Sequence, residues 1–74
     1  MDDATLKTRL GTAIRERRLT LAFSQESFAD SIKMHRAYYS TIERGQRNLT
    51  LTTLWRVCDG LDMTLHELMR NAKL

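Results

Sequence analysis

The sequence contains no proline and only one cysteine, Cys58. A single cysteine cannot form an intrachain disulfide or the paired thiols of a structural zinc site, so a disulfide-stapled secreted fold is excluded. The first ten residues, which include Asp2 and Asp3, hold no apolar run of the length that a signal peptide or a membrane span needs. We therefore expect a cytoplasmic protein with Cys58 in its core.

The chain also lacks repeats, low-complexity segments and any stretch with the strict apolar–polar alternation of a β-strand. Its 74 residues suffice for one domain with a modest core and are too few for two. Hydrophobic residues make up 42% and charged residues 28%, a balance that excludes an intrinsically disordered chain. The sequence predicts a single all-α domain over residues 1–74.

Catalytic and metal-binding patterns are absent as well. His35, His66 and Cys58 are the only soft or borderline metal ligands, and they are scattered without paired spacing. An enzyme that uses nucleophilic catalysis would need a nucleophile, a base and a third orienting group in one pocket, and so small a chain has little room for one. We expect no enzyme, no metal, no cofactor and no small-molecule substrate. The net charge of +3 is consistent with a polyanionic partner without proving one.

Five helices are predicted from apolar residues that recur every three or four positions. In the first helix, Leu6, Leu10 and Ile14 share one stripe, and the outer face carries Lys7, Arg9, Arg15 and Arg18. A fourth helix follows the capping residue Thr50, ends near Gly60 and has apolar positions at Leu51, Leu54, Val57, Cys58 and Leu61. Thr64 and Glu67 have the spacing of a capping box and open a fifth helix, over about residues 64–72.

The second and third helices are short and tightly joined. Ser24 is placed to cap a helix from about Gln25 to Ile32, and a third helix runs from Arg36 to Arg44 after a turn of three residues. Gly45 suits the left-handed conformation that closes a helix. Residues 24–45 therefore form a helix-turn-helix unit in which Tyr39 and Ile42 point inward.

The third helix carries side chains that suit the DNA major groove. Arginine can donate two hydrogen bonds to guanine, and small residues can contact the methyl group of thymine. We expect the reading face to consist of Arg36, Ala37, Ser40 and Thr41. Taken alone, the arginines at and after this helix could be ordinary solvated charges.

A second set of residues is placed to contact the DNA backbone. Gln25, at the start of the second helix, can donate to a phosphate beside the free N–H groups of the helix terminus. The polar segment after the third helix can clamp phosphates, and its last two members are candidates for base contact as well: Arg44, Gln46, Arg47 and Asn48. Glu43 would repel phosphate, so we expect it to pair with a nearby arginine instead.

The stretch from Ser24 to Met69 resembles the Cro/C1-type, lambda-repressor-like helix-turn-helix family. The most specific segment is Ile42-Glu43-Arg44-Gly45 followed by Arg47-Asn48, preceded by Ser24-Gln25-Glu26 and by Phe28, Ala29 and Ile32. The resemblance implies a compact five-helix domain that regulates transcription by sequence-specific binding to double-stranded DNA. It also implies base contacts from Arg36, Ala37 and Thr41, and backbone contacts from Gln25, Tyr38, Arg44 and Arg47. Packing is the alternative role of Tyr38.

More narrowly, Arg36-Ala37-Tyr38-Tyr39-Ser40 and Arg47-Asn48-Leu49-Thr50-Leu51 resemble the controller proteins of restriction-modification systems. That resemblance implies a bacterial or phage regulator that binds paired palindromic sites as a homodimer. The chain departs from the family pattern at three positions: Lys33 replaces a frequent turn glycine, His35 an oxygen-bearing cap, and Leu49 a frequent proline. A lysine at positive φ would lower the stability of the fold.

The apolar residues near the C-terminus exceed what so small a core needs. We expect a homodimer interface through the fifth helix and the loop before it, formed by Trp55, Met63, Leu65, Leu68 and Met69. The alternative is that these residues complete the core of the protomer. Two other functions remain open, a phage-type repressor and the antitoxin of a toxin-antitoxin pair.

Overall fold

The computed structural model describes residues 1–74 and confirms an all-α fold of five helices. The helices are α1 (Asp3–Thr20), α2 (Gln25–Ser31), α3 (Arg36–Glu43), α4 (Leu51–Gly60) and α5 (Leu65–Asn71). The predicted bounds of the second to fifth helices agree with these to within one residue. None of the helices combines the length and the apolar character that crossing a membrane requires.

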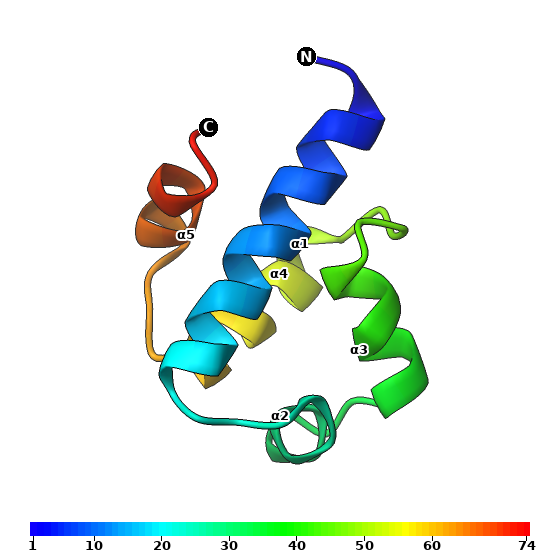
Figure 1. Cartoon of the computed structure of the whole chain (residues 1–74), viewed down its shortest axis with the longest axis vertical. Coiled ribbons are helices and arrows are strands. Elements are labelled where there is room, and N and C mark those ends of the chain that lie inside the picture. The colour runs from blue at the N-terminus through cyan, green and yellow to red at the C-terminus, as the bar shows by residue number, and fades with distance from the viewer.

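The long helix α1 runs through the middle of the molecule, and the other helices pack around it (Figure 1). Helix α3 lies on one side of α1 and α5 on the opposite side, while α2 crosses the lower end and contacts α3. Helix α4 packs against α5. Because α1 contacts both α3 and α5, it joins the helix-turn-helix to the C-terminal part of the chain.

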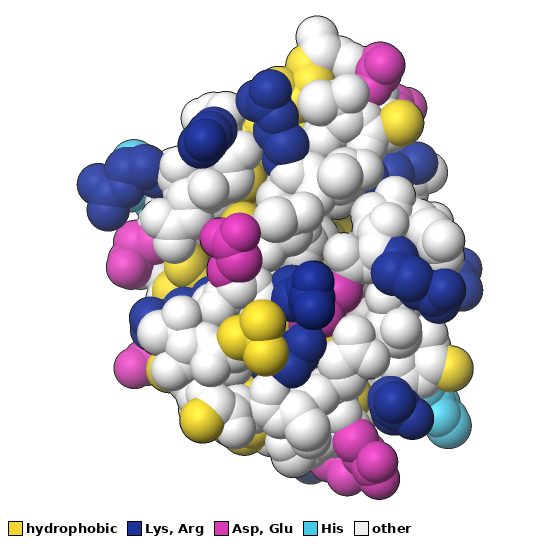
Figure 2. Space-filling model, in the orientation of Figure 1, with side chains coloured by type: hydrophobic (Ala, Val, Ile, Leu, Met, Phe, Trp, Pro, Cys, Tyr) yellow, Lys and Arg dark blue, Asp and Glu magenta, His cyan; other side chains and the backbone are white.

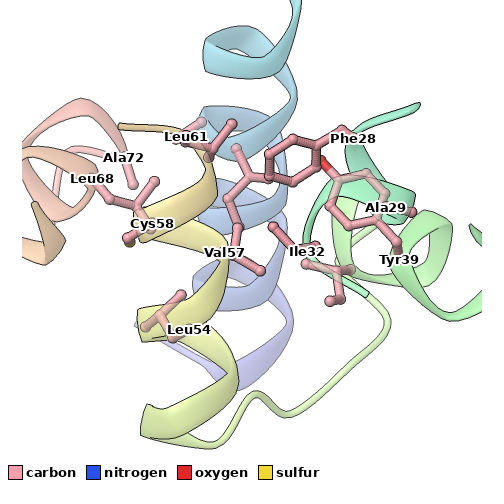
Figure 3. Packing of buried hydrophobic residues seen from close by; sticks show 13 residues of the cluster. Phe28, Ala29, Ile32, Tyr39, Leu54, Val57, Cys58, Leu61, Leu68 and Ala72 are labelled. Atoms are coloured by element: carbon pink, nitrogen blue, oxygen red, sulfur yellow. The ribbon is translucent and has the colours of Figure 1, made fainter. Parts of the chain in front are cut away.

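Thirteen buried hydrophobic residues form one core cluster, to which all five helices contribute. The ring centroids of Phe28 and Tyr39 lie 5.1 Å apart, and Figure 3 shows the two rings beside one another, with Val57 and Ile32 next to them. The predicted inward positions of Tyr39 and Ile42 and the predicted burial of Cys58 are confirmed. Burial raises the pKa of the Cys58 thiol, which favours the uncharged form.

Three leucines do not lie where the sequence predicts them. Leu68, expected in the dimer interface, is fully buried in the protomer beside Cys58 and Ala72, so it completes the core instead (Figure 3). Leu6 and Leu51, placed on apolar stripes, are 38% and 67% exposed. Periodicity identifies the apolar side of a helix, but a residue on that side is buried only where another element covers it.

Helices α1 and α3 approach so closely that only glycine fits at the crossing. A Cβ atom on Gly11 would lie 2.5 Å from the carbonyl oxygen of Glu43 and 2.6 Å from that of Ile42. Both neighbours are backbone atoms, so a larger residue would push α3 away from α1. Gly11 thereby sets the depth at which α3 is seated.

The helix starts agree with the predicted caps. The hydroxyls of Ser24, Thr50 and Thr64 each accept a hydrogen bond from the backbone N–H three residues later, and Glu67 completes the capping box with Thr64. The hydrogen bond from the Thr64 N–H lowers the pKa of Glu67. Asp2 caps α1 in the same way, by accepting from the N–H of Thr5 at 2.8 Å.

A buried ion pair joins α1 to α3. Arg18 Nε lies 2.6 Å from Glu43 Oε2, and Arg18 Nη2 lies 3.0 Å from Glu43 Oε1. The Tyr39 hydroxyl and the Gln25 amide also donate to the carboxylate, and Arg18 Nη1 donates to the Phe23 carbonyl at 2.7 Å. The predicted pairing of Glu43 with an arginine is confirmed, whereas placing Arg18 on the outer face was wrong. A buried glutamate needs a cationic partner, so the expected pairing of Glu43 with an arginine was the one sign in the sequence that an arginine is buried.

Burial raises the pKa of Glu43, but hydrogen bonds from Arg18, Tyr39 and Gln25 outweigh burial and hold the pKa below its ordinary value of 4.5. The hydrogen bond to Glu43 raises the pKa of Arg18. Burial and the neighbouring carboxylate raise the pKa of Tyr39, which therefore stays a hydroxyl donor. The pair is charged throughout the physiological pH range.

We expect Glu43→Gln to lower the free energy of unfolding by about 3–5 kcal/mol, because it leaves the Arg18 guanidinium buried without a counter-charge. Urea titrations of Glu43→Gln, Arg18→Met and the double variant measure this. The double variant should lose less than the sum of the two single losses. Additive losses would show that the two side chains do not interact.

The same pair makes the free energy of unfolding depend on pH in the acid range. The folded-state pKa of Glu43 lies below the unfolded one, so its contribution is fully present above about pH 4.5 and is lost as the pH falls through the lowered value. Between neutral and acid pH, the free energy of unfolding should therefore fall less for Glu43→Gln than for the wild type. Asp2 and Glu67, whose pKa values are also lowered, remain in both proteins, so the difference isolates Glu43.

Candidate nucleic-acid interface

Helices α2 and α3, joined by residues 32–35, leave one face of α3 free. Tyr39, Ile42 and Glu43 are buried against the core, while Arg36 and Ala37 are exposed at the first turn of α3. Ser40 and Thr41 follow one turn later and are partly exposed. The four predicted reading residues therefore lie on one short helix whose other side is anchored.

The turn between α2 and α3 includes backbone strain. Lys33 has φ of 56°, which closes α2 by letting the Met34 N–H reach the Ala29 carbonyl at 2.9 Å. The positive φ expected for this lysine is confirmed. His35 precedes α3 without a side-chain hydrogen bond to the helix, as its departure from the usual cap residues predicts.

The segment after α3 turns back toward α1 at Gly45, which has φ of 72° as predicted. A Cβ atom there would lie 2.9 Å from the Thr8 Cα, so the position also requires a close approach to α1. The N–H of Gln46 closes α3 by donating to the Thr41 carbonyl at 3.0 Å. The four predicted backbone-contact residues of this loop are all exposed: Arg44, Gln46, Arg47 and Asn48.

Arg47 folds back onto the exposed face of α3. Its Nε lies 2.9 Å from the Thr41 hydroxyl oxygen, and its guanidinium carbon lies 5.0 Å from the centroid of the Tyr38 ring. The sequence placed these three residues on one interface but gave no sign of the contacts among them. Arg44 Nε lies at the longer distance of 3.4 Å from the Ser40 carbonyl.

Gln25 stands at the first position of α2, half-buried. Its amide donates to Glu43 Oε1 at 3.0 Å, so one of its N–H groups is used inside the chain and the other remains for an outside acceptor. The ion-pair network thus orients a residue that the sequence placed at the DNA backbone.

Part of the positive charge of the chain lies on the same side of the molecule. Figure 2 shows Lys and Arg side chains on the right, over α3 and the loop after it. The arginines of this side, Arg36, Arg44 and Arg47, have no carboxylate within ion-pair distance, because Arg18 and Glu43 form the one salt bridge of the chain. Their charge is therefore available to an anionic partner.

A second surface, on α4 and the start of α5, is apolar. Trp55 is 65% exposed beside a hollow that Met63, Leu65 and His66 also line. Met69 is partly exposed on α5. Leu51, which the sequence predicted on the buried side, lies one turn before Trp55 and extends this exposed surface.

The five-helix arrangement and the free face of α3 are typical of a helix-turn-helix protein, and comparison with known sequences agrees. The profile of the family described as Helix-turn-helix matches residues 14–68. The chain belongs to this family, whose members bind DNA.

Among its relatives, control protein C.MunI from a Mycoplasma species is 44% identical over 64 residues, which cover 85% of this chain and 86% of the relative. The restriction-modification controller protein C.AhdI from Aeromonas hydrophila has a TM-score of 0.78 at 34% identity, over 82% of this chain and 92% of that one. The clp gene regulator ClgR from C. glutamicum has a TM-score of 0.89 at 25% identity, over 92% and 87%. The resemblance to restriction-modification controllers inferred from the sequence is confirmed.

We expect Lys33→Gly to raise the free energy of unfolding by about 0.5–1 kcal/mol, because relief of the left-handed strain exceeds the added entropy of the unfolded chain. For a domain of this size the melting temperature should rise by about 2–8 °C. The matched control is Arg15→Gly, which removes the same charge from an exposed helical position and should lower the melting temperature. A fall with Lys33→Gly would mean that the turn is unstrained.

Proposed function

We propose that this protein is a controller of a restriction-modification system, which binds a palindromic operator as a homodimer and regulates transcription there. We place its action in the cytoplasm, on the nucleoid of a bacterial host. The observation that carries the proposal is the anchored helix α3, with Arg36 and Ala37 exposed at its start and Arg47 folded onto it, in a chain 44% identical to a control protein.

Base recognition would come from α3 lying in the major groove. Arg36 is exposed at its N-terminal end, where the side chains of such helices reach base edges, and its guanidinium can fork onto the O6 and N7 atoms of guanine. Ala37, Ser40 and Thr41 are small enough to let the helix backbone approach the bases. Burial of Tyr39, Ile42 and Glu43 holds the helix in one orientation.

Backbone contacts would flank α3 on both sides. Gln25 offers its free amide N–H at the start of α2, and the loop after α3 supplies Arg44, Gln46, Arg47 and Asn48. Each arginine that neutralises a phosphate releases a counterion, so binding should weaken as salt rises. These contacts set the register of α3 without carrying sequence information.

Dimerisation would use the apolar surface on α4 and α5. Trp55, Met63, Leu65 and Met69 are exposed or partly exposed there, and a two-fold axis through such a patch pairs it with itself. Two copies of α3 would then enter successive major grooves about 34 Å apart, which requires a palindromic site.

Selection of bound duplexes from a random pool tests this function. The wild type should enrich a palindrome, and Arg36→Ala should lose about 1–3 kcal/mol of affinity and relax the preference at one base of each half-site. Arg44→Ala should weaken binding to all sequences and reduce the salt slope by about one. The control Arg15→Ala removes the same charge from α1 and should change neither. No enrichment by the folded wild type would contradict a sequence-specific regulator.

We expect Trp55→Glu to convert the dimer to a monomer, because it places two charges against each other across the axis. Sedimentation velocity measures the change, and affinity for the full palindrome should fall toward that for a half-site. Leu19→Glu, at a residue 54% exposed near the end of α1, is the control and should remain dimeric. A wild type that is monomeric at every concentration would assign the surface to a different protein, as in an antitoxin.

A further inference from the structure

Arg47 is an exposed side chain that two contacts nevertheless hold in one place. Its Nε donates to the Thr41 hydroxyl oxygen at 2.9 Å, and its guanidinium lies over the Tyr38 ring, 5.0 Å from the centroid. Exposed arginines ordinarily sample many rotamers, and that freedom is lost when they bind. Both partners lie on α3, so the loop residue Arg47 is attached to the proposed reading helix.

The hydrogen of the Thr41 hydroxyl is already committed. The hydroxyl donates to the Tyr38 carbonyl at 2.6 Å, one turn earlier on the same helix. A hydroxyl has one hydrogen, so the oxygen can only accept from Arg47, and no hydrogen is left to donate to a base. Thr41 can therefore offer DNA its methyl group and one lone pair of the hydroxyl oxygen, which can only accept.

Tyr38 contacts Arg47 through its ring and not through its hydroxyl. The hydroxyl makes no hydrogen bond within the chain, whereas the ring packs against the edge of the core and carries the Arg47 guanidinium. A cation over a tyrosine ring is attracted by the negative face of the π-system. Because the ring is itself partly buried against the core, its movement is restricted.

We propose that Tyr38 and Thr41 are positioning residues for Arg47. They hold its guanidinium against α3 before DNA arrives, with Nε engaged and the two terminal nitrogens, which make no hydrogen bond within the chain, left for one pair of acceptor atoms on DNA. The protein therefore loses less side-chain freedom on binding than it would with a free arginine. This inference rests on the proposed DNA-binding function and assigns two of its residues an indirect role.

Conservative substitutions distinguish this role from direct DNA contact. Tyr38→Phe keeps the ring and removes the hydroxyl, while Tyr38→Leu keeps apolar bulk and removes the ring. Thr41→Ser keeps the hydroxyl, while Thr41→Val keeps the shape and a methyl group but cannot accept from Arg47. Thr41→Ser keeps the contact with Arg47 but removes the methyl group, so any loss of operator affinity should be the same with and without Arg47. Operator affinity should be nearly unchanged in Tyr38→Phe. It should fall about two- to fivefold in Tyr38→Leu and Thr41→Val.

The decisive comparison is made in the Arg47→Ala background. There Tyr38→Leu and Thr41→Val should cause no further loss of affinity, because the side chain they position is gone. Equal losses for Tyr38→Phe and Tyr38→Leu would show that the hydroxyl contacts DNA and would overturn the proposal. If Tyr38→Leu and Thr41→Val lose as much operator affinity in the Arg47→Ala background as in the wild type, the proposal is also overturned. Melting curves check each fold, and the Thr41 pair carries the test if Tyr38→Leu does not fold.

A measurement without DNA separates this inference from the proposed function. The Nε–H signal of Arg47 in a proton–nitrogen NMR spectrum, identified by its absence in Arg47→Lys, should be displaced by the ring and protected from exchange with water. Tyr38→Leu and Thr41→Val should move it toward the position of a free arginine. An unmoved signal overturns the positioning contacts, whether or not DNA binds. If the signal moves in these variants but the protein enriches no operator, the proposed function is refuted and the contacts of Arg47 with Tyr38 and Thr41 are still supported.

Discussion

The carboxylate of Glu43 is the group on which the rest of the structure depends. It accepts hydrogen bonds from Arg18 of α1, Tyr39 of α3 and Gln25 of α2, and Arg18 also holds the Phe23 carbonyl in the link from α1 to α2. A buried charge is tolerated only with such partners, so the three helices are constrained to one arrangement. That arrangement, with the close approach at Gly11, determines how far α3 projects from the molecule.

Two sets of arginines differ in what they contact. Arg9, Arg17 and Arg18 bond to segments far away in the sequence or across the core. Arg17, for example, donates to the carbonyls of Leu61 and Asp62 and so ties α1 to the link before α5. Arg36, Arg44 and Arg47 have no acidic partner and lie on or just after α3. A net charge of +3 thus understates how strongly one side of the molecule can attract an anion.

Both proposed surfaces depend on α1 as a common support. Helix α3 is seated on one side of α1 and α5 on the other, and α5 contacts α4, which carries Trp55 (Figure 1). The separation between the reading helix and the apolar surface is therefore fixed within each protomer. For a dimer, such rigidity translates directly into the spacing of two half-sites along DNA.

The sequence by itself determined the five helices, their caps at Ser24, Thr50 and Thr64, the left-handed residues Lys33 and Gly45, and the face of α3 that is free. The helices, their caps and the closing Gly45 follow from contacts within a few residues, which local spacing records, whereas the left-handed Lys33 was inferred from the family's frequent glycine at that turn. Tertiary structure alone decided that Arg18 is buried, that Leu68 belongs to the core while Leu51 is exposed, and that Arg47 rests on Tyr38 and Thr41. The physical reason is that helical periodicity gives each side chain a direction around its own axis, whereas burial and pairing depend on which distant segment lies in that direction.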